Sequence, residues 1–296
     1  MSQLRSVACF FAAIGFYTVS AVCAAQPPTQ PQSVVNQIDH ILIASSDAKE
    51  LFSLLSDTFQ FPVAWPMADY GNFASGGVSV GNVNLEIIKD SAPVAGAAKS
   101  RWTGFALEPA PLQTSLPELD ARGIRHGTPA PFKSRQPDGS FATRWTTVAL
   151  PDVSNDSVEV FFCEYGHDVP ARRRRLLEQL QSREGGPLTV QSVGAIVVGA
   201  KDTKFPRERW QKLLTPIQES SPGVWRVGAG PAIRVIQAEK DGIEGLVINV
   251  KSLKQARRCL KAHDLLGKDH PDSLTLAGPL LNGLNIRLVE QPTKGL

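Results

Sequence analysis

The chain has 296 residues, of which 42% are hydrophobic and 20% charged, values typical of a globular protein long enough for two ordinary domains. Its formal net charge of +3 is small, so the composition indicates neither a nucleic acid nor an anionic membrane as partner. Of the four cysteines, Cys9 and Cys23 lie in an apolar N-terminal stretch, and the remaining two are too few for a disulfide framework.

The first 25 residues have the pattern of a signal peptide. Arg5 supplies a positive charge, residues 7 to 22 are mostly apolar, and small alanines precede Gln26. We therefore expect export to a secreted or periplasmic location, with no membrane partner after cleavage, and an uncleaved anchor is the alternative. Residues 26 to 37 are rich in proline, glutamine and serine and predict a flexible linker.

Residues 38 to 88 predict a strand, a helix and three further strands. Residues 38 to 44 are apolar on both faces around His40, which indicates a buried strand. Residues 47 to 59 carry apolar side chains at spacings of three and four and predict an amphipathic helix, with Asp47 as its N-cap. Glycines separate three short predicted strands, near residues 63 to 67, 73 to 80 and 83 to 88.

His40 and Glu86 lie on the first and last strands of this unit, and a right-handed crossover would place them on one face of the sheet. The order of elements and these two residues resemble a module of the vicinal oxygen chelate superfamily, which includes glyoxalases, bleomycin resistance proteins and extradiol dioxygenases. The resemblance implies that His40 and Glu86 bind a divalent metal. It also implies an α+β fold, in which repeated βαβββ modules pair into half-open mixed β-barrels.

The order of strand, helix and strands recurs near residues 102, 192 and 243, and the last two copies are abbreviated or diverged. Further helices are predicted over residues 112 to 122, 168 to 186, 206 to 214 and 252 to 266. Asn282-Gly283 predicts the turn of a hairpin formed by residues 274 to 281 and 284 to 290. We therefore predict two tandem module pairs and a connecting segment: a glyoxalase-like pair at 38 to 167, a linker helix at 168 to 189, and a diverged pair at 190 to 291.

The predicted linker helix carries four consecutive arginines, Arg172 to Arg175. Such a cluster of guanidinium groups could bind phosphate, but a run of this kind usually coats a solvated helix. The solvated helix is therefore the favoured interpretation.

The resemblance predicts a metal site made of His40, Glu86 and Glu164, in which Glu164 is also the candidate catalytic carboxylate. Glu159 and Glu164 lie five residues apart on the closing strand of the second module and face opposite sides, and the position near the strand end favours Glu164. One histidine and two carboxylates suit Mn, Fe(II), Zn or Mg. In the alternative, no cofactor is bound and His40 is a neutral buried imidazole bonded to a backbone carbonyl.

The sequence departs from the pattern of the superfamily at the positions that match His40. These positions hold Gly104 in the second module and Gly194 and Gly245 in the second half, and glycine has no side chain to bind a metal. Typical two-domain extradiol dioxygenases carry a two-histidine, one-carboxylate iron site in the second half. The resemblance therefore implies that ring cleavage by that route is disfavoured here.

A small-molecule site usually has apolar walls with a few polar groups. The candidate substrate-binding residues are Trp65, Tyr70, Asn72, Phe73, Trp102 and Trp145. Three possibilities remain open. The first is an exported divalent-metal enzyme of isomerase, lyase or dioxygenase type acting on a small oxygenated substrate, and the second is a metal-free protein that binds or sequesters a small molecule. The third is a structural relic, in which the fold remains and serves a partner. Modules of the superfamily often pair between chains, so a homodimer is one expected assembly.

Overall fold

The computed structural model describes residues 31–71, 73–90, 98–166 and 168–291. The predicted signal peptide and Asn72 lie outside the described residues. Of the helices that are described, none is long and apolar enough to cross a membrane.

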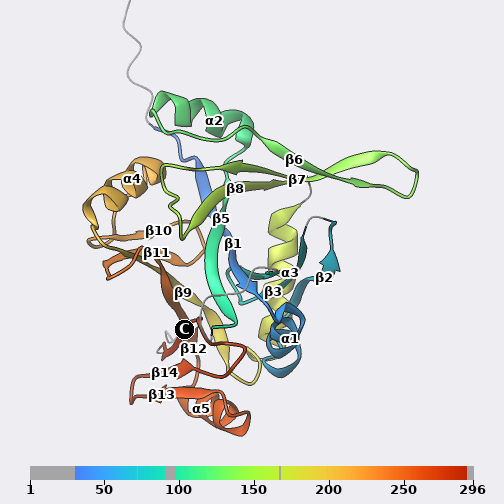
Figure 1. The fold of residues 1–296 in the computed structure, drawn as a ribbon, viewed down its shortest axis with the longest axis vertical. Helices are drawn as coiled ribbons and strands as arrows, with labels where there is room; N and C mark the ends of the chain where they lie inside the picture. The colour runs from blue at the N-terminus through green and yellow to red at the C-terminus, as the bar shows by residue number, and fades with distance from the viewer. Residues whose placement is uncertain (1–30, 72, 91–97, 167, 292–296) are drawn as a thin grey trace, which may run out of the picture. The chain divides into compact units, whose positions relative to one another are not determined.

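The first half of the chain forms one mixed sheet, called sheet 1 here. Its strands are β1 (Val35–Ser45), β2 (Val63–Asp69), β3 (Ala74–Ser79), β4 (Asn84–Lys89), β5 (Ser100–Pro109), β6 (Ala130–Arg135), β7 (Phe141–Ala149) and β8 (Glu159–Tyr165). Over the described residues their order is β2-β3-β4-β1-β5-β8-β7-β6, with β1 parallel to β4 and antiparallel to β5 (Figure 1). The two predicted modules thus meet through their first strands.

Each module of sheet 1 has a helix after its first strand. In the first module this is α1 (Ala48–Ser53), which continues as a π-helical turn over Leu54–Thr58, and in the second it is α2 (Leu112–Ala121). Asp47 directly precedes α1, as predicted for an N-cap, but its carboxylate pairs with Lys99 at 2.6 Å. The predicted capping bond of Asp47 is therefore replaced by an ion pair.

The second half forms sheet 2, which repeats this topology. Its strands are β9 (Val190–Ala200), β10 (Val224–Arg226), β11 (Ala232–Gln237), β12 (Gly242–Val250), β13 (Leu266–Asp269), β14 (Ser273–Leu276) and β15 (Ile286–Glu290), with helices α4 (Lys204–Leu214) and α5 (Leu253–Ala262). Within the described part of the chain the order is β10-β11-β9-β12-β15-β14-β13. β9 is parallel to β11 and antiparallel to β12, as β1 is to β4 and β5. The abbreviated repeats predicted from the sequence therefore form a complete second sheet.

Helix α5 is shorter than its predicted range of residues 252 to 266. Ser252 caps it as predicted, because its hydroxyl accepts a hydrogen bond of 3.2 Å from the Gln255 amide. The helix ends at Ala262, and Asp264 has a left-handed φ of 55° that turns the chain into β13. The sequence-based prediction missed this short strand.

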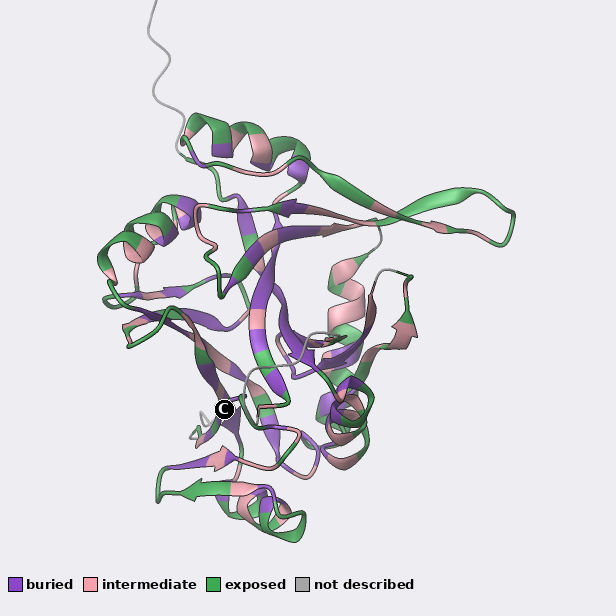
Figure 2. Ribbon diagram, viewed as in Figure 1, coloured by how far each residue is buried: buried purple, intermediate pink, exposed green. Residues whose placement is uncertain are grey.

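The two sheets share one hydrophobic core. The ring of Phe105 on β5 stacks on Trp210 of α4 with centroids 5.7 Å apart, and the buried residues follow β1 and β5 in Figure 2. At the contact between the halves, the Asn82 side chain accepts from the Val193 amide at 2.8 Å and donates to the Val193 carbonyl at 3.1 Å. The predicted α+β class with paired βαβββ modules is confirmed.

Helix α3 (Val169–Ser182) connects the sheets and packs against β3. Its N-terminus is capped by Asp168, whose carboxylate accepts from the Ala171 amide at 3.1 Å. Leu176 and Leu180 anchor one face of α3 in the core. Its first turns, which carry the arginine run, consequently lie beside sheet 1.

Candidate functional site

A cavity lies on the face of sheet 1 that carries His40 and Glu86. Its aromatic wall consists of Trp65, Tyr70, Phe73 and Trp145, and Tyr165 also lines it. Its volume is about 120 Å³. An engineered cavity of roughly 150 Å³ takes up benzene, so this cavity has the size for a single ring.

Stacked rings build the aromatic wall. Phe73 stacks on Tyr70 with ring centroids 5.1 Å apart, and Trp145 presents its edge to Tyr70 at 6.0 Å. Phe132 supports Trp145 from behind at 4.2 Å, with the two rings nearly parallel. Trp65 is held by a hydrogen bond of 3.3 Å from its indole nitrogen to the Ser75 hydroxyl. The structure thus brings four of the predicted substrate-binding residues together.

A β-bulge in β1 determines how Asp39 and His40 are oriented. Ile38 pairs with Leu107 of β5 and His40 pairs with Ala106, so Asp39 is an extra residue without a counterpart in β5. A regular strand would point Asp39 and His40 to opposite faces. Instead, the Asp39 carboxylate lies 2.7 Å from Nδ1 of His40, and both residues are almost fully buried.

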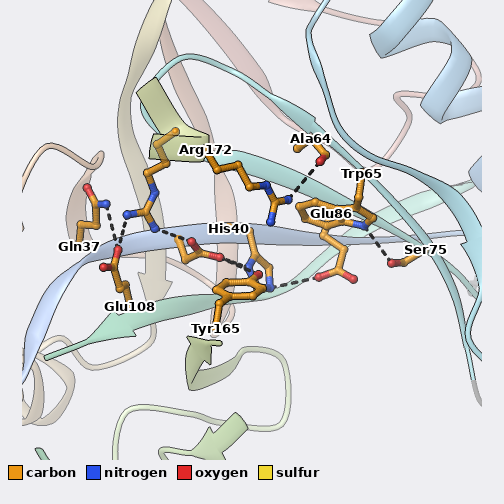
Figure 3. A network of polar contacts seen from close by, with 11 residues as sticks. Gln37, His40, Ala64, Trp65, Ser75, Glu86, Glu108, Tyr165 and Arg172 are labelled. Carbon is orange, nitrogen blue, oxygen red and sulfur yellow. Dashed lines mark hydrogen bonds and ion pairs between the residues drawn. The ribbon is translucent and has the colours of Figure 1, made fainter. Parts of the chain in front are cut away.

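His40 bridges two carboxylates, because its Nε2 lies 3.1 Å from Glu86 (Figure 3). Burial alone would lower the pKa of His40, but the hydrogen bonds to Asp39 and Glu86 outweigh it and raise this pKa to about 9. Burial would raise the pKa of Asp39, but His40 and Arg173 hold it at about 2. At neutral pH His40 is therefore an imidazolium between two carboxylates, not the neutral imidazole considered from the sequence.

Helix α3 supplies two arginines to this network. Arg173 forms ion pairs with both Asp39 and Glu108, and Gln37 donates to Glu108 at 3.0 Å. The Tyr165 hydroxyl also donates to Asp39, at 3.1 Å. The charge of Asp39 is thus balanced by a residue that comes from outside sheet 1.

Arg172 lies at the wall of the cavity. It donates to the Ala64 carbonyl at 3.1 Å, and its guanidinium carbon is 5.5 Å from the Trp65 ring centroid and 5.9 Å from that of Tyr165 (Figure 3). The interpretation of the arginine run as the coat of a solvated helix is therefore wrong for Arg172 and Arg173. It holds for Arg174 and Arg175, which are exposed.

Glu164 is not brought to His40 and Glu86. On β8, Tyr165 lines the cavity and the Phe161 ring contacts His40, so alternation along the strand turns Glu164 to the other face. There its carboxylate accepts from the Leu112 amide at 2.8 Å, at the start of α2. The sequence favoured Glu164 over Glu159 because Glu164 lies near the end of the strand. The side of the sheet to which a residue points, and not its distance from the strand end, determines whether its side chain reaches the cavity.

One other predicted substrate-binding residue, Trp102, does not line the cavity. Trp102 is buried in the hydrophobic core, opposite Ile43 of β1. Asn72 lies outside the described residues. Trp102 was misjudged because aromatic side chains are as common in the core of a barrel as in its mouth.

The pairing of strands identifies the counterparts of His40 and Glu86 in the second module. Asp39 is the extra residue of a bulge in β1 and Thr103 that of a bulge in β5, so matching the two bulges maps His40 onto Gly104 and Leu42 onto Ala106. Leu42 pairs with Glu86 on β4, and Ala106 pairs with Phe161 on β8. Phe161 is therefore the counterpart of Glu86, and its ring lies 5.8 Å from that of His40.

This arrangement leaves an incomplete set of metal donors. A side chain at Gly104 is excluded because even a Cβ would collide with the Glu159 carbonyl oxygen, and Phe161 offers no donor atom. Among the described residues, no group of three or more His, Cys, Asp or Glu side chains is arranged to hold a metal. Three protein ligands are usual for a catalytic zinc, so His40 and Glu86 alone do not fit such a site.

Sequence reasoning missed the roles of Asp39, Arg173 and Tyr165. The adjacent polar pair Asp39-His40 inside an otherwise apolar strand was a readable signal of a bulge or a buried ion pair. The position of Arg173 had no signal in the sequence, because it depends on where α3 packs.

The sequence matches no protein-family model and no curated protein. Solved structures do resemble it. A hypothetical protein from Staphylococcus aureus is 11% identical with a TM-score of 0.58, over 86% of this chain and 99% of that chain. Homoprotocatechuate 2,3-dioxygenase from Arthrobacter globiformis is 12% identical with a TM-score of 0.56, over 89% and 82%. The 2,3-dioxygenase LapB from Pseudomonas sp. KL28 is 11% identical with a TM-score of 0.55, over 88% and 93%.

Both dioxygenases are extradiol enzymes of the vicinal oxygen chelate superfamily. At 11–12% identity the likeness establishes the fold and leaves the activity open. The fold expected from His40, Glu86 and the order of elements is confirmed: the chain has an α+β fold consistent with the vicinal oxygen chelate fold.

Proposed function

We propose that the protein binds a small ring-containing molecule in the cavity of sheet 1, directly and without a resident metal. The observation that carries the proposal is the replacement of donor positions by Gly104 and Phe161 while an aromatic cavity is retained. His40 and Glu86 then act as a preformed polar end of an otherwise apolar pocket. Export and homodimer formation remain part of the proposal.

The charged network gives that polar end a defined state. His40 donates to Asp39 and Glu86 with its two ring nitrogens, so the imidazolium holds the Glu86 carboxylate in place. The side chain of Glu86 retains 13% exposure, and a carboxylate can accept a hydrogen bond from a hydroxyl or N–H group of the ligand. Glu86 is therefore the proposed hydrogen-bond acceptor for the ligand.

A second candidate function is that of a divalent-metal enzyme, with His40 and Glu86 as protein ligands. It is favoured by the bond between Asp39 and Nδ1 of His40, because metal-binding histidines commonly donate their other ring nitrogen to a carboxylate. The ligand set would have to be completed by groups other than Gly104, Phe161 and Glu164.

Metal content and ligand binding separate the two functions. We would purify residues 26–296 without chelator and incubate them with Mn, Fe(II) or Zn, beside a His40→Ala, Glu86→Ala double variant. The proposed function predicts substoichiometric metal in both proteins, and a ligand-induced rise in the melting temperature that survives chelation. Near-stoichiometric metal that is lost in the double variant would overturn it in favour of the metal enzyme.

A further inference from the structure

The cavity continues into a basic rim. A second, more open hollow adjoins it, and the two share Trp65, Arg144 and Arg172 as lining residues. The outer hollow adds Arg175 from the next turn of α3. A molecule that fills the inner cavity would therefore extend past two arginines on its way to solvent.

The acidic groups at this site already have cationic or backbone partners. Glu86 lies 3.1 Å from Nε2 of His40, and Asp39 is paired with both His40 and Arg173. Asp168, which lines the outer hollow, accepts a hydrogen bond from the Ala171 amide at the start of α3. Among the described residues, three arginines, Arg144, Arg172 and Arg175, line the outer hollow together with the one carboxylate of Asp168, so the charged side chains that line the entrance are positive on balance.

The two shared arginines differ in how firmly they are held. Arg172 is fixed over the Trp65 and Tyr165 rings and bonded to the Ala64 carbonyl. Arg144, on β7, is exposed and adjoins Trp145 of the aromatic wall. A guanidinium group is planar and matches the geometry of carboxylates and phosphates, and it also stacks on aromatic faces. The combination suits a flat ring with an anionic end.

We propose that the ligand of this cavity is a planar ring that carries an acidic oxygen group, with the ring against the aromatic wall and the acidic group at Arg144 and Arg172. This inference rests on the proposed function, since it names the class of molecule that the same cavity binds. The inner volume of about 120 Å³ restricts the buried part to one ring.

Benzoate and phenylphosphonate serve as acidic probes, and benzamide is the neutral planar control. Binding is measured by calorimetry and by the fluorescence of the tryptophans, two of which line the cavity. We expect both acids to bind at least tenfold more tightly than benzamide. Arg144→Gln and Arg172→Gln should each weaken the acids about tenfold and leave benzamide unchanged, whereas Arg174→Gln, on the exposed side of α3, should change neither.

Unchanged benzamide binding also demonstrates that the arginine variants are folded. Equal affinities for benzoate, phenylphosphonate and benzamide, or acids that bind equally well to both arginine variants, would overturn the anionic ligand and leave the proposed binding function standing. If no probe binds the wild-type protein at millimolar concentration, both the anionic ligand and the proposed function are wrong.

Discussion

Sheets 1 and 2 share one topology but differ in the polar residues that they bury. In the described part of sheet 1, Asp39 and His40 are buried charged or titratable groups beside a cavity, whereas the buried polar residues of sheet 2 are Asn249 and Ser273, both uncharged. At Gly194, a Cβ would meet the side-chain oxygen of Asn249 at 2.9 Å, and Asn249 donates to Ser192 at 3.0 Å. The middle of sheet 2 is therefore filled by an amide, where sheet 1 keeps a pocket.

The difference shows what a buried charge requires. A buried carboxylate is costly unless it is paired and hydrogen-bonded, and Asp39 has His40, Arg173 and Tyr165 as partners. Arg173 comes from α3, which packs on sheet 1. Sheet 2 satisfies its interior with a local amide–hydroxyl bond and needs no such helix. The same topology can therefore hold either a paired buried charge or a neutral amide–hydroxyl bond, and the side chains at these positions determine which of the two is present.

The largest effect is expected from Arg173→Ala, which removes a cationic partner from Asp39. The free energy of unfolding should fall by about 3 to 5 kcal/mol, because a buried carboxylate loses part of its compensation. Urea denaturation measures the change. Arg174→Ala, the exposed neighbour, should stay within about 0.5 kcal/mol of wild type. Equal effects of the two variants would contradict the role assigned to Arg173.

The pH dependence of stability should originate in sheet 1. The pKa of His40 rises from 6.5 to about 9 on folding, so its contribution is complete below pH 6.5 and is lost as the pH rises through 9. The loss is about 3 kcal/mol, since each unit of pKa difference corresponds to about 1.4 kcal/mol. The pKa of Asp39 falls from 3.8 to about 2, so its contribution is present above pH 3.8 and is lost as the pH falls toward 2.

Denaturation between pH 6 and 10 tests this assignment. His40→Gln should flatten the alkaline decline, whereas Asn249→Ala, in sheet 2, should lower stability by the same amount at every pH. If the stability of His40→Gln still declines at alkaline pH, the group that titrates is not His40.

Gly104→Ala is expected to have an intermediate effect. The added Cβ would collide with the Glu159 backbone, which cannot rotate away, so the free energy of unfolding should fall by about 2 kcal/mol. Gly242→Ala in sheet 2, where a Cβ would meet nothing within 4 Å, is the matched control and should cost less than about 0.5 kcal/mol. A neutral Gly104→Ala would reopen this position to a metal-binding side chain.

The smallest effect is expected at Gly194, where the obstacle is a side chain. Gly194→Ala should lower the free energy of unfolding by about 1 kcal/mol, because Asn249 must shift by a few tenths of an ångström. In the Asn249→Ala background the same substitution should have no cost. A double-mutant cycle measures this coupling, and additive effects would show that Asn249 does not fill the middle of sheet 2.

The sequence alone determined the repeated order of strands and helices and the α+β class, because hydrophobic periodicity and turn residues act locally. It also placed His40 and Glu86 together, since the crossover connection returns β4 to the side of β1. The aromatic residues of the first module pair were recognisable as a wall, although Trp102 shows that composition does not separate a pocket from a core.

Only the tertiary structure decided the chemistry of the site. A one-residue bulge turned Asp39 to the side of His40, and the face of β8 directed Glu164 away and Phe161 inward. The packing of α3 made Arg173 the partner of Asp39. These outcomes depend on strand register and on contacts between residues more than a hundred positions apart, and neither is encoded in a local pattern of the sequence.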